Sequence, residues 1–231
     1  MLDLHCHLLP AIDDGPATIN DAVALCQASW ALGITTAVAT PHFSHTYPTR
    51  SDAAETAASL LRNELAAQGC GLELLVGAEI SIHALHQLDR AGLRRRTLGS
   101  GNCLLIEPPF DDGPDSIELM INDLMVDGFD VLIAHPERSG YLHSRPEILQ
   151  RLVARGAYGS VTAASLQGKF GRSVKKEALR LCASGLIHNV SSDAHDIRSR
   201  QPGLDTGRKP VEGLPAQSEM DSIAARLLAA D

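Results

Sequence analysis

The sequence has few aromatic residues and no long apolar run. Only 3% of its 231 residues are aromatic, and Trp30 is the single tryptophan, so platforms for stacking single-stranded nucleic acid are poorly supported. No apolar stretch approaches the roughly 20 residues of a membrane span, and the N-terminus lacks the basic and apolar regions of a signal peptide. We therefore expect a soluble, cytoplasmic protein without membrane insertion.

The sequence also lacks the cysteine patterns of disulfide frameworks and of thiolate phosphatases. Its five cysteines are odd in number, widely scattered and without a C-x-x-C pair, which favours a reducing cytoplasm. A thiolate phosphatase needs an arginine at the sixth position after its cysteine, so that loop amides and the arginine hold the phosphate together. The residues at that distance from the five cysteines are Ile12, Leu32, Val76, Pro109 and His188. A cysteine-based mechanism is thereby excluded.

Basic residues are too few to balance the acidic ones. The formal net charge of -8 argues against a nucleic-acid partner, because binding to a phosphate backbone needs a basic face. An acidic protein can still bind an anionic substrate where metal ions and a few arginines make one site positive. A chain of this length with 44% hydrophobic residues can bury a full core, and we expect residues 1–231 to form a single domain.

Predicted strands and helices alternate along the whole chain. Strands are expected at the N-terminus and at 34–40, 72–76, 102–106, 131–134, 157–162 and 187–191. Helices are expected at about 18–32, 51–68, 115–128, 146–155, 174–184 and 216–229, with a short helix and basic loop at 83–96 and a loop at 201–215. Alternation of this kind implies a mostly parallel sheet.

The first strand carries the pattern around which the other motifs are arranged. Because leucines alternate with polar residues there, the side chains of His5 and His7 point to the same face. Asp13 and Asp14 follow in a short loop. Imidazole and carboxylate groups together suit zinc, manganese or iron, so this segment predicts part of a divalent-metal site.

Similar donors stand at the ends of most other predicted strands. Six of the seven strands end in His, Asp or Glu. In parallel α/β barrels the chemistry is built at the C-terminal ends of the strands, so a closed or nearly closed β/α barrel explains this placement better than an open sheet. The nine candidate ligands are His5, His7, Asp14, His42, Glu79, Glu107, His135, Asp193 and His195. They are too many for one ion and fit two or three.

These motifs together resemble one known superfamily. They are Asp3-Leu4-His5-Cys6-His7-Leu8-Leu9-Pro10 with Asp13-Asp14-Gly15, Ala39-Thr40-Pro41-His42, Gly77-Ala78-Glu79, the strand end at Glu107, Ala134-His135-Pro136-Glu137-Arg138, Thr162-Ala163-Ala164-Ser165-Leu166 with Gly168-Lys169-Phe170-Gly171, and Ser192-Asp193-Ala194-His195. In this order they resemble the polymerase-and-histidinol-phosphatase (PHP) superfamily. Within it, the chain is most similar to the bacterial manganese-dependent protein tyrosine phosphatases of capsule and exopolysaccharide gene clusters.

The resemblance implies an α/β fold, a distorted seven-stranded TIM-like (β/α)7 barrel of the PHP type with a trinuclear metal centre at the C-terminal strand ends. By position it places His5, His7 and Asp193 on one ion, Glu79 as a bridge to a second held by Glu107 and His135, and Asp14, His42 and His195 on the third. Arg138 and Arg200 match the family's phosphate-binding arginines, with Arg198 as a close competitor of Arg200. Ala11 and Ala164 stand where the family usually has glycine, a departure that concerns loop geometry.

The resemblance also implies two to three divalent ions, manganese first with iron or zinc as alternatives. The substrate class implied is a phosphotyrosine protein, in particular a polysaccharide-synthesis tyrosine kinase, and the family often self-associates into homo-oligomers. A hydroxide that bridges two ions is a nucleophile at neutral pH and can attack phosphorus in line. No general acid is identifiable, and a phenolate with a pKa of about 10 can leave without one.

Two other functions stay open at this point. A small-molecule phosphomonoesterase such as histidinol phosphatase shares the metal motifs, although the compact length and the motif at 162–171 favour the tyrosine phosphatase. A non-catalytic barrel that binds metals or a partner is the alternative from another class. The intact set of nine ligands argues against it.

Overall fold

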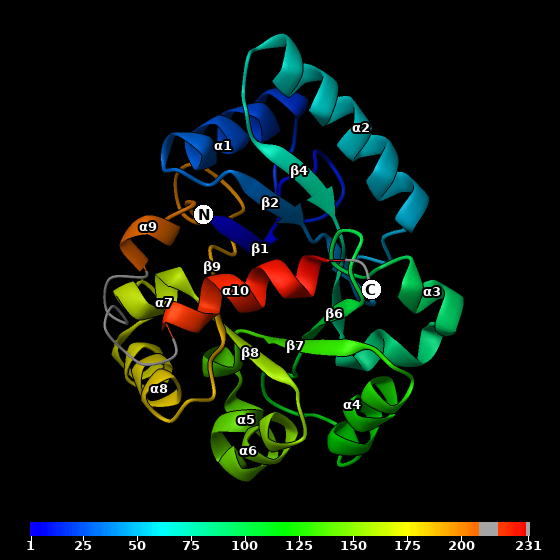
Figure 1. Ribbon diagram of the computed structural model, residues 1–231, viewed down its shortest axis with the longest axis vertical. Helices are drawn as coiled ribbons and strands as arrows, with labels where there is room; N and C mark the ends of the chain where they lie inside the picture. The colour runs from blue at the N-terminus through cyan, green and yellow to red at the C-terminus, as the bar shows by residue number, and fades with distance from the viewer. Residues whose placement is uncertain (208–216, 230–231) are drawn as a thin grey trace.

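The computed structural model describes residues 1–207 and 217–229, which fold as parallel β-strands surrounded by helices (Figure 1). One sheet has the strand order β1-β2-β4, from Leu2–Cys6, Thr36–Ala39 and Glu73–Val76. The other has the order β3-β5-β6-β7-β8-β9, from His42–Phe43, Glu79–Ser81, Cys103–Glu107, Asp130–Ala134, Tyr158–Thr162 and Asn189–Ser191. All neighbouring strands in both sheets pair in parallel, as the alternation of strands and helices predicts.

The two sheets contain more strand segments than the sequence predicts. Short strands β3 and β5 follow β2 and β4 after breaks of two residues, at Thr40-Pro41 and Gly77-Ala78. Pro41 has no N–H to give to a ladder, which explains the first break. Hydrogen bonds continue across the breaks, from Gly77 N to Ala39 O at 2.9 Å and from Glu79 N to Pro41 O at 3.2 Å. Each pair of segments therefore runs on as one path from the first sheet into the second.

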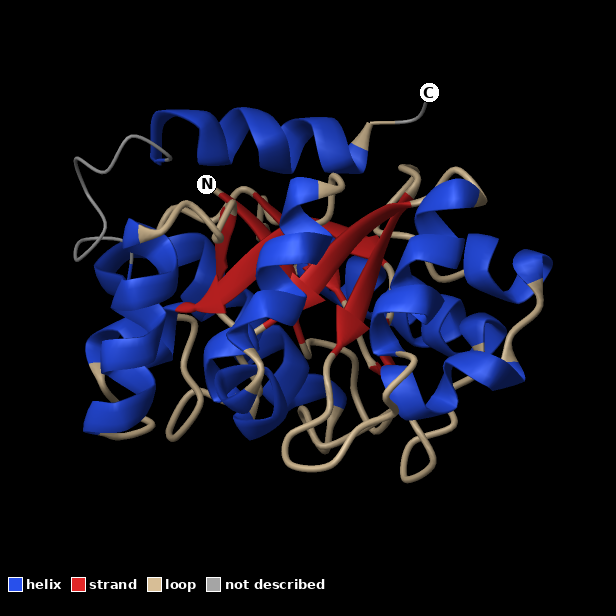
Figure 2. Ribbon diagram, turned by 90° about the horizontal axis from the view of Figure 1, so that it is seen from below, coloured by secondary structure: helices blue, strands red, loops and turns tan. Residues whose placement is uncertain are grey.

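Helices follow most strands and cover the sheets on the outside (Figures 1 and 2). The α-helices are α1 (Ile19–Ala31), α2 (Ser51–Ala67), α3 (Arg90–Arg94), α4 (Ile117–Val126), α5 (Gly140–Ser144), α6 (Pro146–Ala154), α7 (Ala163–Gln167), α8 (Arg172–Ala183), α9 (Leu204–Gly207) and α10 (Gln217–Leu228). Two 3₁₀ helices are η1 (Ile82–Gln87) and η2 (Pro136–Arg138). No helix of the described residues combines the length and apolarity that crossing a membrane requires.

The observed helices can be compared with the helices and loops that the sequence predicts. Thr18 accepts a hydrogen bond from Asp21 N at 3.2 Å and is the N-cap of α1, at the expected start of the helix. The expected loop at 201–215 contains α9, so that expectation is wrong at Leu204–Gly207, and 208–215 lies outside the described residues. Trp30 of α1 is 44% exposed and lies against Gly71.

Apolar side chains pack on both faces of the strands. The larger cluster lies between the strands and the outer helices. A smaller, fully buried cluster combines alternate strand residues such as Leu4, Val38 and Leu105 with Ala224 and Leu227 of α10. Helix α10 lies near the strand starts, where its Arg226 donates to the Tyr158 hydroxyl, and Figure 2 shows it on the side opposite to the long loops. The strand ends are thereby left free for a site.

Candidate metal centre

The nine candidate ligands lie at or just beyond the C-terminal ends of the parallel strands. Each belongs to at least one set of side chains whose donor atoms all lie within 4.8 Å of one another. The sets are His7, Asp14, His42 and His195; His5, His7 and Asp193; His5, Glu79 and His135; and His42, Glu79 and Glu107. Because the sets share members, they form one continuous cluster.

Glu79 lies in the middle of this cluster and is 1% exposed. Its Oε2 is 3.3 Å from Nε2 of both His5 and His7 and 3.0 Å from Nδ1 of His42. Its Oε1 is 2.8 Å from Nε2 of His135. Burial opposes ionisation of Glu79, but the charge of His5 and the hydrogen bond with His135 outweigh it and lower the pKa of Glu79. A carboxylate surrounded by four imidazoles is arranged to bridge ions.

Asp14 and Asp193 complete the cluster on two other sides. Asp193 Oδ1 is 3.6 Å from His5 Nε2 and 3.7 Å from His7 Nε2. Asp14 Oδ1 is 3.2 Å from His195 Nε2 and 3.4 Å from His42 Nε2, and its side chain is 39% exposed. The cluster therefore reaches from a dry interior at Asp193 to a solvent-facing rim at Asp14.

Several donor atoms of the cluster lack hydrogen-bond partners and are of the types that bind divalent cations. Glu79 Oε2 and His195 Nε2 are buried and make no hydrogen bond of normal geometry in the described structure. The Nε2 atoms of His5 and His7 face each other at 3.4 Å. Unpaired buried polar atoms are costly, and imidazole nitrogens with carboxylate oxygens are the donor set of zinc, manganese and iron. The residues present therefore fit a metal centre.

The shifted pKa values of His42 and Glu107 reflect the attraction of the cluster for positive charge. Burial opposes protonation of His42, but its close contacts with the Asp14 and Glu79 carboxylates outweigh it and raise the pKa of His42 to about 11. Burial and the neighbouring Glu79 carboxylate raise the pKa of Glu107. Carboxylates held this close together take up protons where a cation is not bound.

Two of the candidate ligands have strained backbones. His135 has a φ of 29° and Asp193 a φ of 52°, in the left-handed region that non-glycine residues rarely adopt. Such conformations cost about 1–3 kcal/mol each and persist where the surrounding structure holds them. The only other non-glycine residue of this kind in the described chain is Ala11, with a φ of 56° in the loop that carries Asp14. This is the position where the resemblance leads one to expect glycine.

Asp13 supports the cluster from outside it. Its Oδ2 accepts from His7 Nδ1 at 2.6 Å and from His42 N at 3.1 Å, and its Oδ1 accepts from Gly15 N at 3.0 Å. These bonds turn Nε2 of His7 toward Glu79 and tie the loop to β3. A histidine ligand is commonly oriented by a carboxylate on its other nitrogen. Sequence reasoning noted Asp13 only as a neighbouring carboxylate, because its orienting role depends on which nitrogen of His7 it meets.

Both predicted arginines reach the cluster. Arg138 Nη1 and Arg200 Nη2 each donate to Asp193 Oδ2 at 2.6 Å. Arg200 Nη1 also lies 3.8 Å from Asp14 Oδ2. Arg198 instead lines a neighbouring cavity of about 620 Å³, beside Asp14 and His195. The structure thus places Arg200, not Arg198, in the cavity of the cluster.

This cavity has a volume of about 170 Å³ and one aromatic wall that sequence reasoning missed. Phe110 is 43% exposed and stacks on His135, with ring centres 5.8 Å apart and an interplanar angle of 17°. The guanidinium carbon of Arg138 lies 5.5 Å from the centre of the Phe110 ring and 4.7 Å from that of Phe170. The signal for Phe110 was weak, since it follows Glu107 by three residues in a loop without periodicity.

The molecule is an α/β protein with a candidate metal centre. Its parallel strands bring imidazoles, carboxylates and two arginines to one cavity. The chain belongs to the family described as capsular polysaccharide synthesis, CpsB/CapC, which matches residues 1–226.

Relatives of the chain are named as tyrosine-protein phosphatases. Tyrosine-protein phosphatase YwqE of Bacillus subtilis is 38% identical over 201 residues, which cover 87% of this chain and 79% of the relative. The putative tyrosine-protein phosphatase CapC of Staphylococcus aureus is 34% identical over 204 residues, which cover 87% of this chain and 79% of that protein. Tyrosine-protein phosphatase CpsB of Streptococcus agalactiae serotype V is 26% identical over 218 residues, which cover 91% and 89%.

Solved structures agree with these relatives. A crystal structure from work on YwqE of Bacillus subtilis and CpsB of Streptococcus pneumoniae, described there as metal-dependent tyrosine phosphatases, has a TM-score of 0.90 and 35% identity. It covers 99% of this chain and 94% of that one. The lactonase Lmo2620 of Listeria monocytogenes has a TM-score of 0.52 at 11% identity, covers 97% of this chain and 91% of that one, and shares the fold alone.

Proposed function

We propose that this protein is a metal-dependent phosphatase that hydrolyses phosphotyrosine in proteins. The observation that carries the proposal is the cluster of nine metal-type donors at the strand ends, six of which line one cavity together with two arginine side chains. The names of the relatives agree with it. Family membership in capsular polysaccharide synthesis makes a polysaccharide-synthesis tyrosine kinase the proposed substrate protein.

The proposed metal ligands follow the family resemblance. The first group is itself one of the donor sets, the third lies within another, and Glu79 shares separate sets with His135 and with Glu107. His5, His7 and Asp193 hold one ion, and Glu79 links it to a second ion held with Glu107 and His135. Asp14, His42 and His195 hold the third; their contacts at 3.2 and 3.4 Å support this assignment. Manganese is the proposed metal, with iron or zinc as alternatives. Bound divalent ions lower the pKa of coordinated water from about 15.7 to about 7 and so supply a nucleophile at neutral pH.

The arginines act on the phosphoryl group. Arg138 and Arg200 aim their guanidinium groups at the same oxygen of Asp193, so both reach one region of the cavity. A phosphoryl group there accepts hydrogen bonds from both, and its charge is neutralised as the ester bond breaks. The phenolate of tyrosine leaves without a dedicated acid, because its pKa of about 10 makes it a good leaving group.

Phe110 favours an aromatic substrate over histidinol phosphate. One face of its ring is stacked on His135, while 43% of the residue is exposed at the cavity that holds the arginines. A phenyl ring entering with its phosphate toward Arg138 meets Phe110, and aromatic pairs of this kind contribute about 0.5–1.5 kcal/mol. Phosphotyrosine gains this contact through its ring.

The finer description of the fold is also a proposal. Counted as single paths, β2 with β3 and β4 with β5 make seven strands, and we propose that they form a distorted seven-stranded (β/α)7 barrel within one domain. Hydrogen bonds from Asp193 N to His5 O at 2.9 Å and from His7 N to Ala194 O at 2.8 Å support contact between the first and last strands. A cytoplasmic location, supported by five free cysteines, and self-association into a homo-oligomer complete the proposal.

One experiment separates the three candidate functions. Metal content and hydrolysis of a phosphotyrosine peptide and of histidinol phosphate are measured for wild type, His42→Ala and the control His83→Ala. His83 is an exposed histidine in η1. We expect two to three metals per chain and peptide hydrolysis in wild type and the control, and loss of peptide hydrolysis in His42→Ala. Turnover of histidinol phosphate alone would favour the small-molecule phosphatase, and metal without any hydrolysis would favour the binding barrel.

A further inference from the structure

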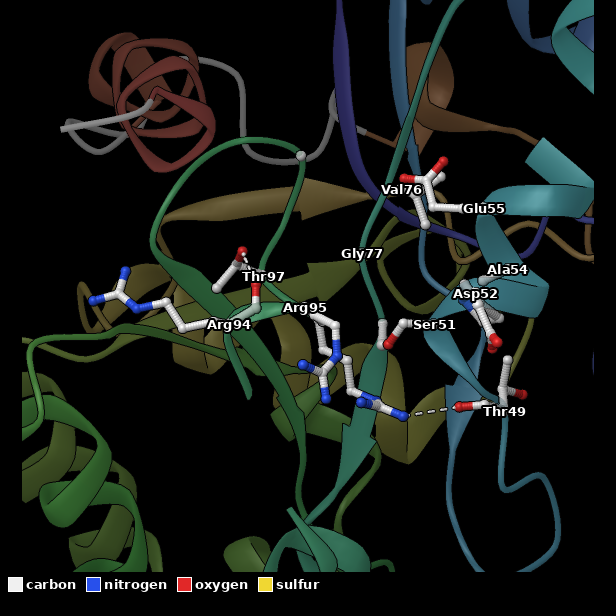
Figure 3. Close-up of a pocket in the computed structure, with 14 residues that line it drawn as sticks. Thr49, Ser51, Asp52, Ala54, Glu55, Val76, Gly77, Arg94, Arg95 and Thr97 are labelled. Carbon is white, nitrogen blue, oxygen red and sulfur yellow. Dashed lines mark hydrogen bonds between the residues drawn. The ribbon is translucent and has the colours of Figure 1, made fainter. Parts of the chain in front are cut away.

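Two consecutive arginines face the start of helix α2 across a second cavity. Arg95 and Arg96 follow Arg94, the last residue of α3, and with Thr49 and Ser51 they line a space of about 380 Å³ (Figure 3). None of the candidate metal ligands lines this space. The cavity is therefore a separate feature of the molecule, and the proposed phosphatase activity does not use it.

Arg96 is a buried cation whose described neighbours carry no compensating charge. It is 8% exposed, and it donates to the carbonyl oxygens of Gly92 and Thr49, both at 3.1 Å. Its guanidinium carbon lies 4.2 Å from the centre of the Phe43 ring. No carboxylate of the described residues forms an ion pair with it. Burial and the adjacent Arg95 lower its pKa, as expected for a cation without an anion.

Arg95 adds a second positive charge at the same place. It is exposed, and within the described residues it makes no side-chain hydrogen bond or ion pair. The acidic residues of the opposite wall are already occupied: Asp52 pairs with Arg50 at 2.6 Å, and Glu55 pairs with Arg62 at 3.3 Å. With these carboxylates paired elsewhere, Arg95 and Arg96 are cations of this space that have no ion pair within the described residues.

The start of α2 supplies neutral donors to the same space. This helix has 17 residues, and its N-cap residue Arg50 makes no side-chain capping hydrogen bond, although Asp52 Oδ1 accepts from Ala53 N at 3.0 Å. The Ser51 Oγ atom is buried without a partner, and in Figure 3 it points to the side of the cavity where the arginines lie. Unpaired N–H groups at a helix start and arginine side chains both favour anions, and arginine matches phosphate in geometry.

We propose that this cavity is a second anion site that binds a phosphate group. Arg95 and Arg96 donate to its oxygens from one wall, and the Ser51 hydroxyl donates from the other. The phosphate can belong to a free anion or to a phosphorylated side chain of a protein, and both offer the same tetrahedral oxygens. The metal centre binds phosphate esters separately, so the two sites differ in their dependence on Arg95.

Calorimetric titration of the metal-loaded protein with inorganic phosphate tests the proposal. Arg95→Gln is compared with wild type and with Arg94→Gln as a matched control. Arg94 is the neighbour in the chain, but its side chain turns away in Figure 3, donating to Asn102 Oδ1 at 2.9 Å and lying 5.1 Å from the Phe129 ring centre. Circular dichroism checks folding of each variant, and Ser51→Ala probes the opposite wall.

The expected result is one class of phosphate binding that Arg95→Gln weakens about tenfold or more, in line with the roughly 1.5–3 kcal/mol of a charged hydrogen bond. Arg94→Gln retains that class, Ser51→Ala weakens it less, and hydrolysis of p-nitrophenyl phosphate stays unchanged in all three. Equal isotherms for wild type and Arg95→Gln would overturn the proposal, as would equal losses in Arg94→Gln and Arg95→Gln.

A second titration identifies the source of the phosphate. A phosphoserine peptide and inorganic phosphate are compared in wild type and Arg95→Gln. Tighter, Arg95-dependent binding of the peptide assigns the site to a phosphorylated protein, whereas equal or tighter binding of inorganic phosphate assigns it to a free anion. Both outcomes support an anion site, and binding of either probe that ignores Arg95 contradicts it.

Discussion

Asp13 accepts a hydrogen bond of 2.6 Å from Nδ1 of His7, and both side chains are almost completely buried. The bond leaves Nε2 of His7 to face Glu79 at 3.3 Å. One carboxylate outside the cluster thus fixes both the tautomer and the direction of a candidate ligand inside it.

We expect Asp13→Asn to weaken metal binding by about 10–100-fold, the usual effect of losing a carboxylate behind a histidine ligand. The amide keeps the size of the side chain but can present an N–H to His7. Metal content after dialysis against a graded chelator measures the change. Asp127→Asn, at an exposed position beyond α4, is the control, and equal metal retention in the two variants would contradict the orienting role.

The two arginines of the cavity are expected to matter for catalysis and not for metal content. Arg138→Lys and Arg200→Lys each lose planar, two-pronged donation to the phosphoryl group, so kcat/KM for a phosphotyrosine peptide falls by about 10²-fold. Arg198→Lys, in the neighbouring cavity, changes it less than threefold, about 0.6 kcal/mol. Steady-state kinetics with metal analysis checks this. A stronger effect at Arg198 than at Arg200 would reverse the assignment.

Phe110→Ala is expected to reduce the preference for aromatic phosphates. Loss of the exposed ring removes about 0.5–1.5 kcal/mol of stacking, which raises KM for a phosphotyrosine peptide about 2- to 12-fold. An alkyl phosphate such as phosphoserine peptide gains nothing from the ring, so its KM stays near the wild-type value. Leu119→Ala removes a large exposed side chain on α4 and is the control. Equal changes for both substrates would show that Phe110 does not contact the substrate ring.

Ala11→Gly is expected to stabilise the protein. Alanine at a φ of 56° pays about 1–2 kcal/mol for the left-handed conformation, while glycine adds about 0.4–1 kcal/mol of unfolded-state entropy, so a net gain of about 0.5–1 kcal/mol remains. Ala17→Gly, in the same loop at an ordinary φ, is expected to destabilise by about 0.4–1 kcal/mol. Urea unfolding of both variants measures the difference, and a loss of stability in both would contradict the strain.

The pair between Glu118 and Arg151 gives a prediction on pH. Hydrogen bonds from Arg151, at 2.5 and 3.0 Å, lower the pKa of Glu118 below its usual range near 4.5. A carboxyl group whose pKa is lower in the folded state stabilises the protein at pH values above its unfolded-state pKa. This stabilisation is lost as the pH falls through the folded-state pKa. Wild type is therefore more stable than Glu118→Gln at pH 7, by a small amount, and the difference shrinks below about pH 4. A constant difference from neutral to acid pH would contradict this.

The α/β class and its parallel sheets could be predicted because strand and helix patterns alternate so regularly. That His5 and His7 point to the same face could be predicted from their spacing of two residues on one strand, because this needs no tertiary information. The segments β3 and β5 could not be predicted, because two or three residues pair as a strand only when a neighbouring strand is present. The exposure of Trp30 depends on which helix face meets the sheet, and an apolar stripe alone does not decide it.

Site features that depend on packing could not be predicted from the sequence. Arg198 and Arg200 are alike in type and nearly equal in position, and the turn after β9 decides which one meets Asp193. Phe110 becomes part of the cavity only because its loop folds back onto His135. Local patterns therefore identify donors at strand ends, while the supporting and lining residues are set by contacts between distant loops.

Glu79 belongs to two of the donor sets and touches the imidazoles of four histidines. Where Glu79 bridges two cations, as proposed above, binding of the first would orient its other oxygen for the second, and we expect the positions to fill cooperatively. A titration of stripped protein should then follow a sigmoidal curve, and partly loaded molecules should be scarce. The loading of such a centre would change steeply over a narrow range of free cation concentration.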